Sequence, residues 1–312
     1  MIVSRINVNV YFVNINDFKK YFIKIKMKIY FNNFWDHNKN ICKFNFWKHL
    51  FNKFYYSFTD NIKDADIVIY SIFYNNKPLE IHKNKKNIFI TFEPLHTNLE
   101  YFDLNISHEI NKKNTHDSKN IICSPQMLLS IYNNEIPRSL FLNNRPIRTN
   151  IPNKFCCFIT RVEKPERIHF FHELSKYKQV DSLGECLNNT GIYAPHDRYE
   201  FEKMVSQYKF IITFENCQKD MYITEKILHG YYSMSIPIYW GSKNIHNYFN
   251  SNSFIYIDNY DQSSILKAIN RIIEIDNNNE LYLDIVNQPV FSIDIDEHFN
   301  HITNKIRDNL KE

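Results

Sequence analysis

Glycine is scarce in this chain of 312 residues, which contains only Gly184, Gly191, Gly230 and Gly241. A Walker A loop or a G-x-G-x-x-G turn needs glycines at fixed spacing, and no such set occurs. This absence disfavours kinases, P-loop nucleoside triphosphatases and standard dinucleotide-binding dehydrogenases. A nucleotide ligand would therefore be held by helix N-termini and by lysine or arginine side chains.

Cysteine pairs and long apolar runs are also missing. None of the six cysteines forms a C-x-x-C pair, so buried reduced thiols are a simpler expectation than a zinc site or a disulfide framework. No stretch reaches the roughly 18 consecutive apolar residues of a membrane span. Polar residues between Arg5 and Asp17 interrupt any signal-peptide core. We expect a protein without a membrane span, located in a cytoplasm.

Charge is moderate, with a formal net charge of +4. Nucleic-acid-binding proteins usually carry a stronger and more concentrated positive charge. A net charge of this size is as compatible with a small anionic ligand as with a polyanion. We expect no nucleic-acid partner. Hydrophobic residues form 44% of the chain, which is enough for substantial cores. None of these features determines the oligomeric state.

The length favours two domains, because domains commonly hold about 100–200 residues. A polar, proline-bearing segment at 143–152 is the best candidate linker. We divide the chain into an N-terminal extension of uncertain order, a first domain, a second domain and a C-terminal helical segment, at 1–26, 27–145, 146–290 and 291–312.

Strand and helix patterns alternate on both sides of the linker. The expected strands are 23–31, 67–70, 87–92, 155–160, 210–214, 236–240 and 254–258. The expected helices are 44–54, 126–132, 165–177, 198–208, 262–275 and 279–286, followed by an amphipathic segment at 293–310. The fold class is therefore α/β, with parallel sheets that carry helices on both faces. Ligands of such sheets bind at the carboxyl ends of the strands.

The stretch from Phe210 to Ser242 is the most informative, and it predicts strand, loop, helix and strand. Thr224 is a good N-cap residue, which would place Glu225 and Lys226 in the first helical turn. Unpaired backbone N–H groups and the helix dipole at such a turn favour a phosphate. Lys226 adds a positive charge, and Glu225 adds an acceptor for hydroxyl groups. The stretch predicts a binding site for a sugar diphosphate.

The segments FEN, YITEK and PIYWGS in this stretch resemble the α1,3/4-fucosyltransferases of glycosyltransferase family ten, especially the short soluble bacterial type. Further matches follow in the family's order: KIYFNNFW at 28–35, IFITFEP at 88–94, CSPQMLLSIY at 123–132, the segment 154–184 and ELYLDIVNQP at 280–289. The resemblance covers roughly residues 27–290.

The resemblance implies a GT-B architecture, in which two Rossmann-like domains with parallel sheets face a cleft, acceptor domain first and donor domain second. It also implies GDP-β-L-fucose as donor, a glycan as acceptor and inversion at the anomeric carbon. The family needs no metal bound through a D-x-D motif, so no cofactor is expected.

Several residues match the family's site by position. Glu93 matches the proposed general base, and a carboxylate at a strand end facing a cleft can take a hydroxyl proton. Arg167 matches an arginine that contacts the diphosphate, and together with Lys226 it could stabilise the GDP leaving group in place of a metal. Thr224 joins the site as the expected cap. The other matching donor-site residues are Asn216, Tyr222, Glu225 and Lys226.

Plain structural explanations compete with these roles. Asn216 could cap a turn, Tyr222 could pack, and Arg167 could be a solvated helix residue. The family usually has glycine before the base, where this chain has Phe92, and that change reshapes the acceptor side. Cys217 stands where the family has serine or threonine.

Two D-x-D triplets and a histidine pair suggest metal sites only weakly. A strand entry explains Asp64-Ala-Asp66, and a helix start explains Asp294-Ile-Asp296. His169 and His172 share a helix face without completing an H-E-x-x-H motif. We expect no metal at any of these positions.

These features together predict an enzyme, a glycosyltransferase that moves L-fucose from GDP-β-L-fucose to a glycan hydroxyl. The expected acceptor is the 3-hydroxyl of GlcNAc in an N-acetyllactosamine-type glycan. One alternative is a related GT-B transferase for glucose or a protein-linked glycan. The other is a catalytically silent carbohydrate-binding relative, which the retention of Glu93, Arg167, Glu225 and Lys226 argues against.

Overall fold

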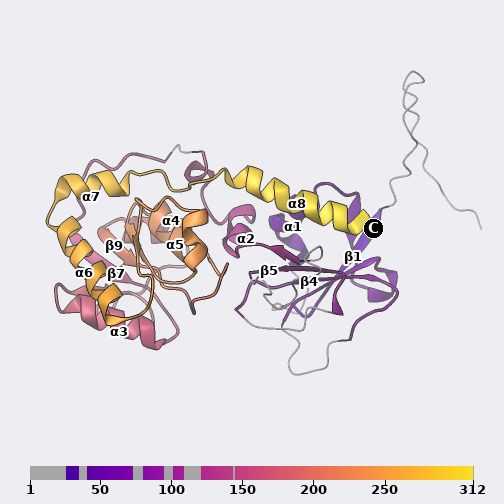
Figure 1. The fold of residues 1–312 in the computed structure, drawn as a ribbon, viewed down its shortest axis with the longest axis horizontal. Coiled ribbons are helices and arrows are strands. Elements are labelled where there is room, and N and C mark those ends of the chain that lie inside the picture. The colour runs from indigo at the N-terminus through magenta and orange to yellow at the C-terminus, as the bar shows by residue number, and fades with distance from the viewer. Residues whose placement is uncertain are drawn as a thin grey trace, which may run out of the picture.

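Two α/β units lie side by side in the computed structural model, which describes residues 26–34, 41–72, 80–94, 101–108, 121–142 and 145–311 (Figure 1). The expectations for residues 1–25, for Trp35 and for the start of the linker at 143–144 lie outside the described residues.

The first unit contains a six-stranded sheet in the order β2-β1-β3-β4-β5-β6, and its strand pairings are all parallel. Its strands are β1 (Met27–Asn32), β2 (Tyr56–Phe58), β3 (Ile67–Tyr70), β4 (Lys86–Ile90), β5 (Leu104–Ser107) and β6 (Ile121–Cys123). Its helices are α1 (Asn45–Leu50) and α2 (Met127–Tyr132), with 3-10 turns at Ile41–Lys43, Ile62–Asp64 and Arg138–Leu140.

The second unit contains a five-stranded parallel sheet in the order β11-β10-β9-β7-β8. Its strands are β7 (Lys154–Phe158), β8 (Val180–Ser182), β9 (Tyr208–Ile212), β10 (Ile236–Tyr239) and β11 (Ile255–Tyr256). Its helices are α3 (Pro165–Ser175), α4 (Arg198–Val205), α5 (Lys226–Tyr232), α6 (Gln262–Asp276) and α7 (Asn279–Val286), with a 3-10 turn at Lys243–Asn247.

The predicted fold class, α/β with two Rossmann-like parallel sheets, is confirmed. The domain limits at 26/27, 145/146 and 290/291 stay predictions. None of the helices in the described part of the chain is both long enough and apolar enough to cross a membrane.

The last helix, α8 (Ile295–Lys311), returns from the second unit and lies along the first (Figure 1). Its buried residues recur at helical spacing and form one apolar face: Ile295, Phe299, Ile302 and Ile306. The ring of Phe299 stacks on Tyr132 of α2, with centroids 3.8 Å apart. The Tyr132 hydroxyl donates to Asp296 Oδ1 at 2.7 Å. The predicted amphipathic segment is thus a helix that depends on the first unit.

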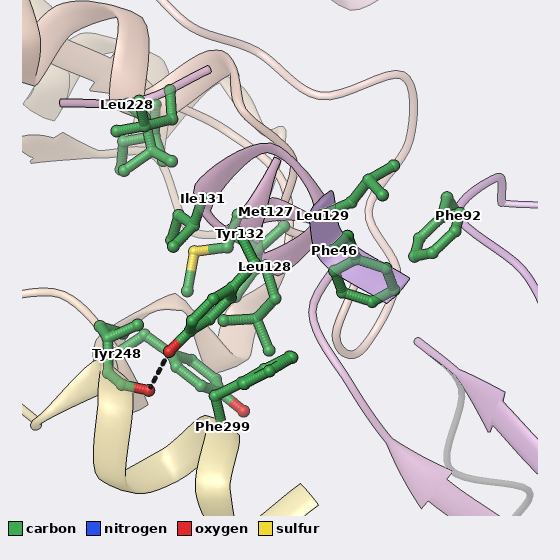
Figure 2. Close-up of a cluster of buried hydrophobic side chains, with 14 of the residues drawn as sticks. Phe46, Phe92, Met127, Leu128, Leu129, Ile131, Tyr132, Leu228, Tyr248 and Phe299 are labelled. Atoms are coloured by element: carbon green, nitrogen blue, oxygen red, sulfur yellow. Dashed lines mark hydrogen bonds between the residues drawn. The ribbon is translucent and has the colours of Figure 1, made fainter. Parts of the chain in front are cut away.

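A single hydrophobic cluster runs through both units. Figure 2 shows Leu128 and Tyr132 of α2 close to Phe46 of α1 and Phe299 of α8, with Leu228 of α5 nearby. Because these side chains come from both units, burial at this junction stabilises the units relative to each other as well as individually.

We expect Phe299→Ala to lower the free energy of unfolding by about 3–5 kcal/mol, as removal of a buried aromatic ring does. Urea denaturation at pH 7 measures the change. Leu266→Ala is the control because Leu266 is exposed, and it should cost less than about 0.5 kcal/mol. Equal effects of the two substitutions would show that α8 is not docked.

A buried ion pair lies at the amino end of β9. Lys209 Nζ donates to Asp276 Oδ1 at 2.8 Å, and Lys178 and Tyr177 donate to Oδ2 at 3.2 and 3.0 Å. Burial by itself would raise the pKa of Asp276, but these hydrogen bonds lower it overall. The depressed pKa means that the ionised carboxylate stabilises the folded state.

Asp276→Asn should therefore reduce stability by about 3 kcal/mol at pH 7, because Lys209 is left without its buried partner. The difference from wild type should be fully present above the ordinary aspartate pKa of about 3.9 and should shrink as the pH falls through the lower folded-state value. Urea unfolding at pH 7, 5 and 3 measures this, with the exposed Asp284→Asn as control. A difference that stays constant down to pH 3 would contradict the assignment.

Candidate functional site

The candidate site lies where the carboxyl ends of β7 and β9 meet. The two strands pair in parallel with Phe158 opposite Ile212, so the residues that follow them share one edge of the sheet. The chain passes from β7 to β8 on one side and then places β9 on the other side of β7. Such a reversal of strand order opens a crevice in which α/β sheets bind ligands.

Two adjoining cavities open at this edge. One of about 580 Å³ is lined by Arg167, Asn216, Glu225 and Lys226 among others. The second, of about 590 Å³, is lined by segment 134–136 of the first unit and by residues of the second unit, so it lies between the units. Glu225 lines both cavities. The sequence-predicted cations and Glu225 are therefore brought together at one cleft.

Arg167 lies in the first turn of α3, where Pro165 begins the helix. Its guanidinium donates to Thr160 Oγ1 at 3.1 Å, to the Phe214 carbonyl at 2.8 Å and to Asn216 Oδ1 at 2.8 Å. The side chain is buried rather than a solvated helix residue. Arg167 thus connects the end of β7 to the end of β9. A guanidinium has five N–H groups, so these three hydrogen bonds leave N–H groups that can bind a ligand.

The turn into α5 differs from the prediction at Thr224. The helix begins at Lys226, and Glu225 rather than Thr224 is its N-cap. Thr224 is buried, its backbone N–H donates to Glu215 Oε1 at 2.7 Å, and its hydroxyl donates to Glu215 Oε2 at 2.8 Å. The helix thus starts one residue later than predicted, yet Thr224 Oγ1 still accepts from the Lys226 N–H at 3.4 Å, as a capping side chain does.

Charges alternate along this turn. Lys226 Nζ donates to Thr224 Oγ1 at 2.9 Å and to Glu215 Oε2 at 3.3 Å, and it lies 3.8 Å from Glu225 Oε1. Burial opposes the charged form of Lys226, but Glu215 and Glu225 raise its pKa overall. Burial likewise would raise the pKa of Glu225, which Lys226 and His229 lower overall. Both side chains are ionised at neutral pH.

Asn216 and Tyr222 lie behind these charges. Asn216 Nδ2 donates to the Tyr222 hydroxyl at 3.3 Å, while Asn216 Oδ1 accepts from Arg167. Tyr222 is buried and meets the ring of His108 edge to face at 5.4 Å. Asn216 lines the smaller cavity, and Tyr222 is not among the residues that line it.

Glu93 belongs to the first unit, where it follows β4. Its backbone N–H donates to Thr91 Oγ1 at 3.2 Å in a tight turn, and the residue is half-buried. Burial raises the pKa of Glu93, Lys226 lowers it and Glu225 raises it, with a net increase. Glu93 therefore lies close enough to the turn before α5 for the charges of Lys226 and Glu225 to influence its pKa.

Hydrogen bonds join the two units beside the cleft. Lys219 Nζ donates to the Pro94 carbonyl at 2.8 Å, next to Glu93. The Met127 N–H donates to the Ile223 carbonyl at 2.8 Å. A side-chain hydrogen bond from Gln126 helps to lower the pKa of Glu225. The first unit thus holds the donor-side turn in place.

Sequence reasoning missed Thr160, Gln126, His229 and Glu215. Glu215 carried a signal, because it directly follows an apolar run where a strand of a parallel sheet ends. Thr160 follows β7 in the same manner. His229 lies one helical turn after Glu225 on α5, a spacing that the sequence already shows. Gln126 reaches the site from the first unit, for which no local pattern exists.

The D-x-D triplets have structural partners. Asp66 Oδ2 accepts from the Lys28 N–H at 2.7 Å, and Asp294 Oδ1 accepts from the Glu297 N–H at 2.9 Å at the start of α8. His169 Nδ1 lies 3.1 Å from the Tyr260 hydroxyl. Across the described ranges, the histidine, cysteine and acidic side chains form no group of three or more arranged to hold a metal ion.

Comparison with known families gives one matching model, glycosyltransferase family 10 (fucosyltransferase) C-terminal, over residues 152–287. This range contains the strand ends, α3 and the turn into α5. Every sequence-predicted site residue except Glu93 falls inside it.

Curated relatives extend the similarity. A protein of Acanthamoeba polyphaga mimivirus named as a fucosyltransferase is 34% identical over 213 residues, which are 66% of this chain and 34% of that protein. The alpha-(1,3)-fucosyltransferase FucT of Helicobacter pylori is 35% identical over 136 residues, 43% of this chain and 27% of that protein. GDP-fucose protein O-fucosyltransferase 3 of Xenopus tropicalis is 34% identical over 128 residues, 39% of this chain and 27% of that protein. The chain thus spans about a third or less of the length of these relatives.

Among solved structures, a crystal structure of an alpha1,3-fucosyltransferase matches with a TM-score of 0.70 and 21% identity, over 95% of this chain and 93% of that one. A crystal structure of an alpha1,3-fucosyltransferase with GDP-fucose matches with a TM-score of 0.69, also at 21% identity, over 95% of this chain and 94% of that one. At this identity the likeness shows the fold, and the predicted GT-B architecture is confirmed.

Proposed function

We propose that this chain transfers L-fucose from GDP-β-L-fucose to a glycan hydroxyl with inversion. Residues 152–287 match the glycosyltransferase family 10 (fucosyltransferase) model, in agreement with the sequence resemblance. One observation carries the proposal. Glu93 is a half-buried carboxylate whose pKa is raised, and Lys226, whose charge acts on it, lines one cavity together with Arg167.

The two sides of the cleft have complementary chemistry. A base acts best when its pKa lies near the working pH, and burial moves Glu93 in that direction. Lys226 has three ammonium hydrogens, of which Thr224 and Glu215 take two, so one remains for a phosphate oxygen. Arg167, in the same cavity, adds a second cation.

The reaction is a single displacement. The acceptor oxygen forms a bond to C1 of fucose while Glu93 takes its proton. The bond from C1 to the β-phosphate oxygen breaks, and its electron pair leaves with GDP. Arg167 and Lys226 stabilise that negative charge, which makes metal-independent transfer our proposal. The ionised Glu225 stabilises the positive charge that the sugar gains, or holds its hydroxyl groups.

The 3-hydroxyl of GlcNAc in an N-acetyllactosamine-type glycan is the acceptor that we propose. The relative in Helicobacter pylori supports the α1,3 linkage, and a Bos taurus relative named 4-galactosyl-N-acetylglucosaminide 3-alpha-L-fucosyltransferase 9 supports the acceptor. A second candidate is a protein acceptor. The match to a GDP-fucose protein O-fucosyltransferase favours it, because that match is of comparable identity and length. We place either reaction in a cytoplasm.

Glu93→Gln should keep GDP affinity within about two-fold and lower fucose transfer by at least about 100-fold, because it removes only the base. GDP release from GDP-fucose is followed with N-acetyllactosamine, lactose, GlcNAc and an unglycosylated protein acceptor. Asp64→Asn is the control, since Asp64 is an acid of the first unit that lies in a D-x-D triplet. Full activity of Glu93→Gln would rule out the base, and loss of activity in Asp64→Asn would indicate a D-x-D enzyme.

Lys226→Ala should weaken GDP binding by about 10- to 100-fold, the effect of losing a charged hydrogen bond worth about 1.5–3 kcal/mol. Isothermal titration calorimetry with GDP measures the affinity. Lys243→Ala is the matched control, because Lys243 is an exposed lysine of the same unit. Unchanged GDP affinity in Lys226→Ala would remove Lys226 from the phosphate site.

A further inference from the structure

Building on the proposed function, we propose that Glu215 is a positioning residue for fucosyl transfer. Its carboxylate fixes Thr224 and Lys226 so that the lysine points at the leaving diphosphate. Glu215 itself has no exposed surface, so it acts on the substrate only through these neighbours.

The hydrogen bonds of the Glu215 carboxylate are made with Thr224 and with Lys226, the first residue of α5. Oε1 accepts from the Thr224 N–H at 2.7 Å, and Oε2 accepts from the Thr224 hydroxyl at 2.8 Å and from Lys226 Nζ at 3.3 Å. The Thr224 oxygen in turn accepts from Lys226 Nζ at 2.9 Å. The ammonium group is therefore held from two directions, with one hydrogen left for the cavity.

The surrounding backbone makes room for this carboxylate. The Glu215 N–H donates to the Trp240 carbonyl at 2.9 Å, which carries the pairing of β9 and β10 past the ends of both strands. A Cβ atom on Gly241 would lie 2.5 Å from Glu215 Cγ and 2.6 Å from the Tyr239 hydroxyl. Glycine at position 241 is thus required by the close approach of Glu215.

Stability alone does not account for such a residue. A buried ion pair often contributes no more than apolar residues of the same volume would, because removing both charges from water is costly. The second unit has another pair of this kind, Lys209 with Asp276, at the opposite end of β9. The difference is that Lys226 lines the cavity, whereas Lys209 does not contact it. The Glu215 pair is placed where its cation can meet a ligand.

The charge of Lys226 depends on its neighbours. The titratable and charged groups that act on it from the elements around the cleft are Glu93, Arg167, Glu215, Glu225 and His229. Burial lowers the pKa of Lys226, and Glu215 is the strongest opposing influence. Removal of the Glu215 charge should therefore lower that pKa.

The experiment compares wild type, Glu215→Gln, Glu215→Asp and Asp276→Asn in fucose transfer between pH 6 and 10.5. Glu215→Gln should lower kcat by about 10- to 100-fold. This is the size of the effect in metal enzymes when a residue that orients a metal ligand, without touching the metal, is removed. In Glu215→Gln, the decrease of kcat/KM at alkaline pH should begin at a lower pH than in wild type, because Lys226 loses its proton at a lower pH. Glu215→Asp keeps the charge and should keep the alkaline limb while kcat falls.

Asp276→Asn is the matched control, because it breaks a buried carboxylate–lysine pair of the same unit away from the cavity. It should lose stability yet keep the wild-type pH profile and kcat at a temperature where all variants are folded. A Glu215→Gln profile that coincides with those of wild type and Asp276→Asn would overturn the proposal.

A direct measurement covers failure of the variants to fold. The Lys226 ammonium is titrated in the wild-type protein by NMR of 13C-labelled lysine, with Lys226→Arg used to assign the signal. A pKa above the ordinary value of about 10.4 supports the influence of Glu215, and a value at or below it overturns the proposal. This titration needs no substrate. A wild-type protein that neither binds GDP nor transfers fucose would instead refute the proposed function.

Discussion

The parallel pairing of β7 with β9 is the constraint on which the site depends. It brings Thr160 and segment 214–216 to one edge, although more than fifty residues separate them in the chain. Arg167 then ties both strand ends together through three hydrogen bonds. Loss of that pairing would separate Arg167 from the turn that carries Lys226, so the two cations would no longer line one cavity.

Electrostatic balance is the second organising principle of the cleft. The donor side holds two cations, and each has carboxylates close enough to influence its pKa. In the proposed reaction, a diphosphate adds negative charge to a site whose cations are already fixed by protein groups. Little reorganisation is then needed when the leaving group gains charge, which is how preorganised sites accelerate reactions.

The sequence predicted the elements and residues that have strong local patterns. Strand 67–70 and the helices near 165–177 and 262–275 follow from apolar runs, a proline start and helical periodicity, and they are present. Arg167, Asn216, Glu225 and Lys226 were predicted and line one cavity. Strands β2, β5 and β6 span only three or four residues, too few for a period of two to appear. The helix after Thr224 starts one residue later than predicted, although Thr224 Oγ1 accepts from the Lys226 N–H as the prediction requires.

Helix α8 follows the second unit in the chain but packs against the first unit, where Phe299 lies on Tyr132. The order of the elements along the chain therefore differs from their grouping in space. A chimera that exchanges the first unit between relatives has to exchange residues 295–311 together with the segment around β1–β6. Otherwise the apolar face of α8 packs against side chains of the other relative, whose shapes are not matched to it. Recombination between such genes at a single crossover near residue 145 would, for the same reason, produce mismatched cores.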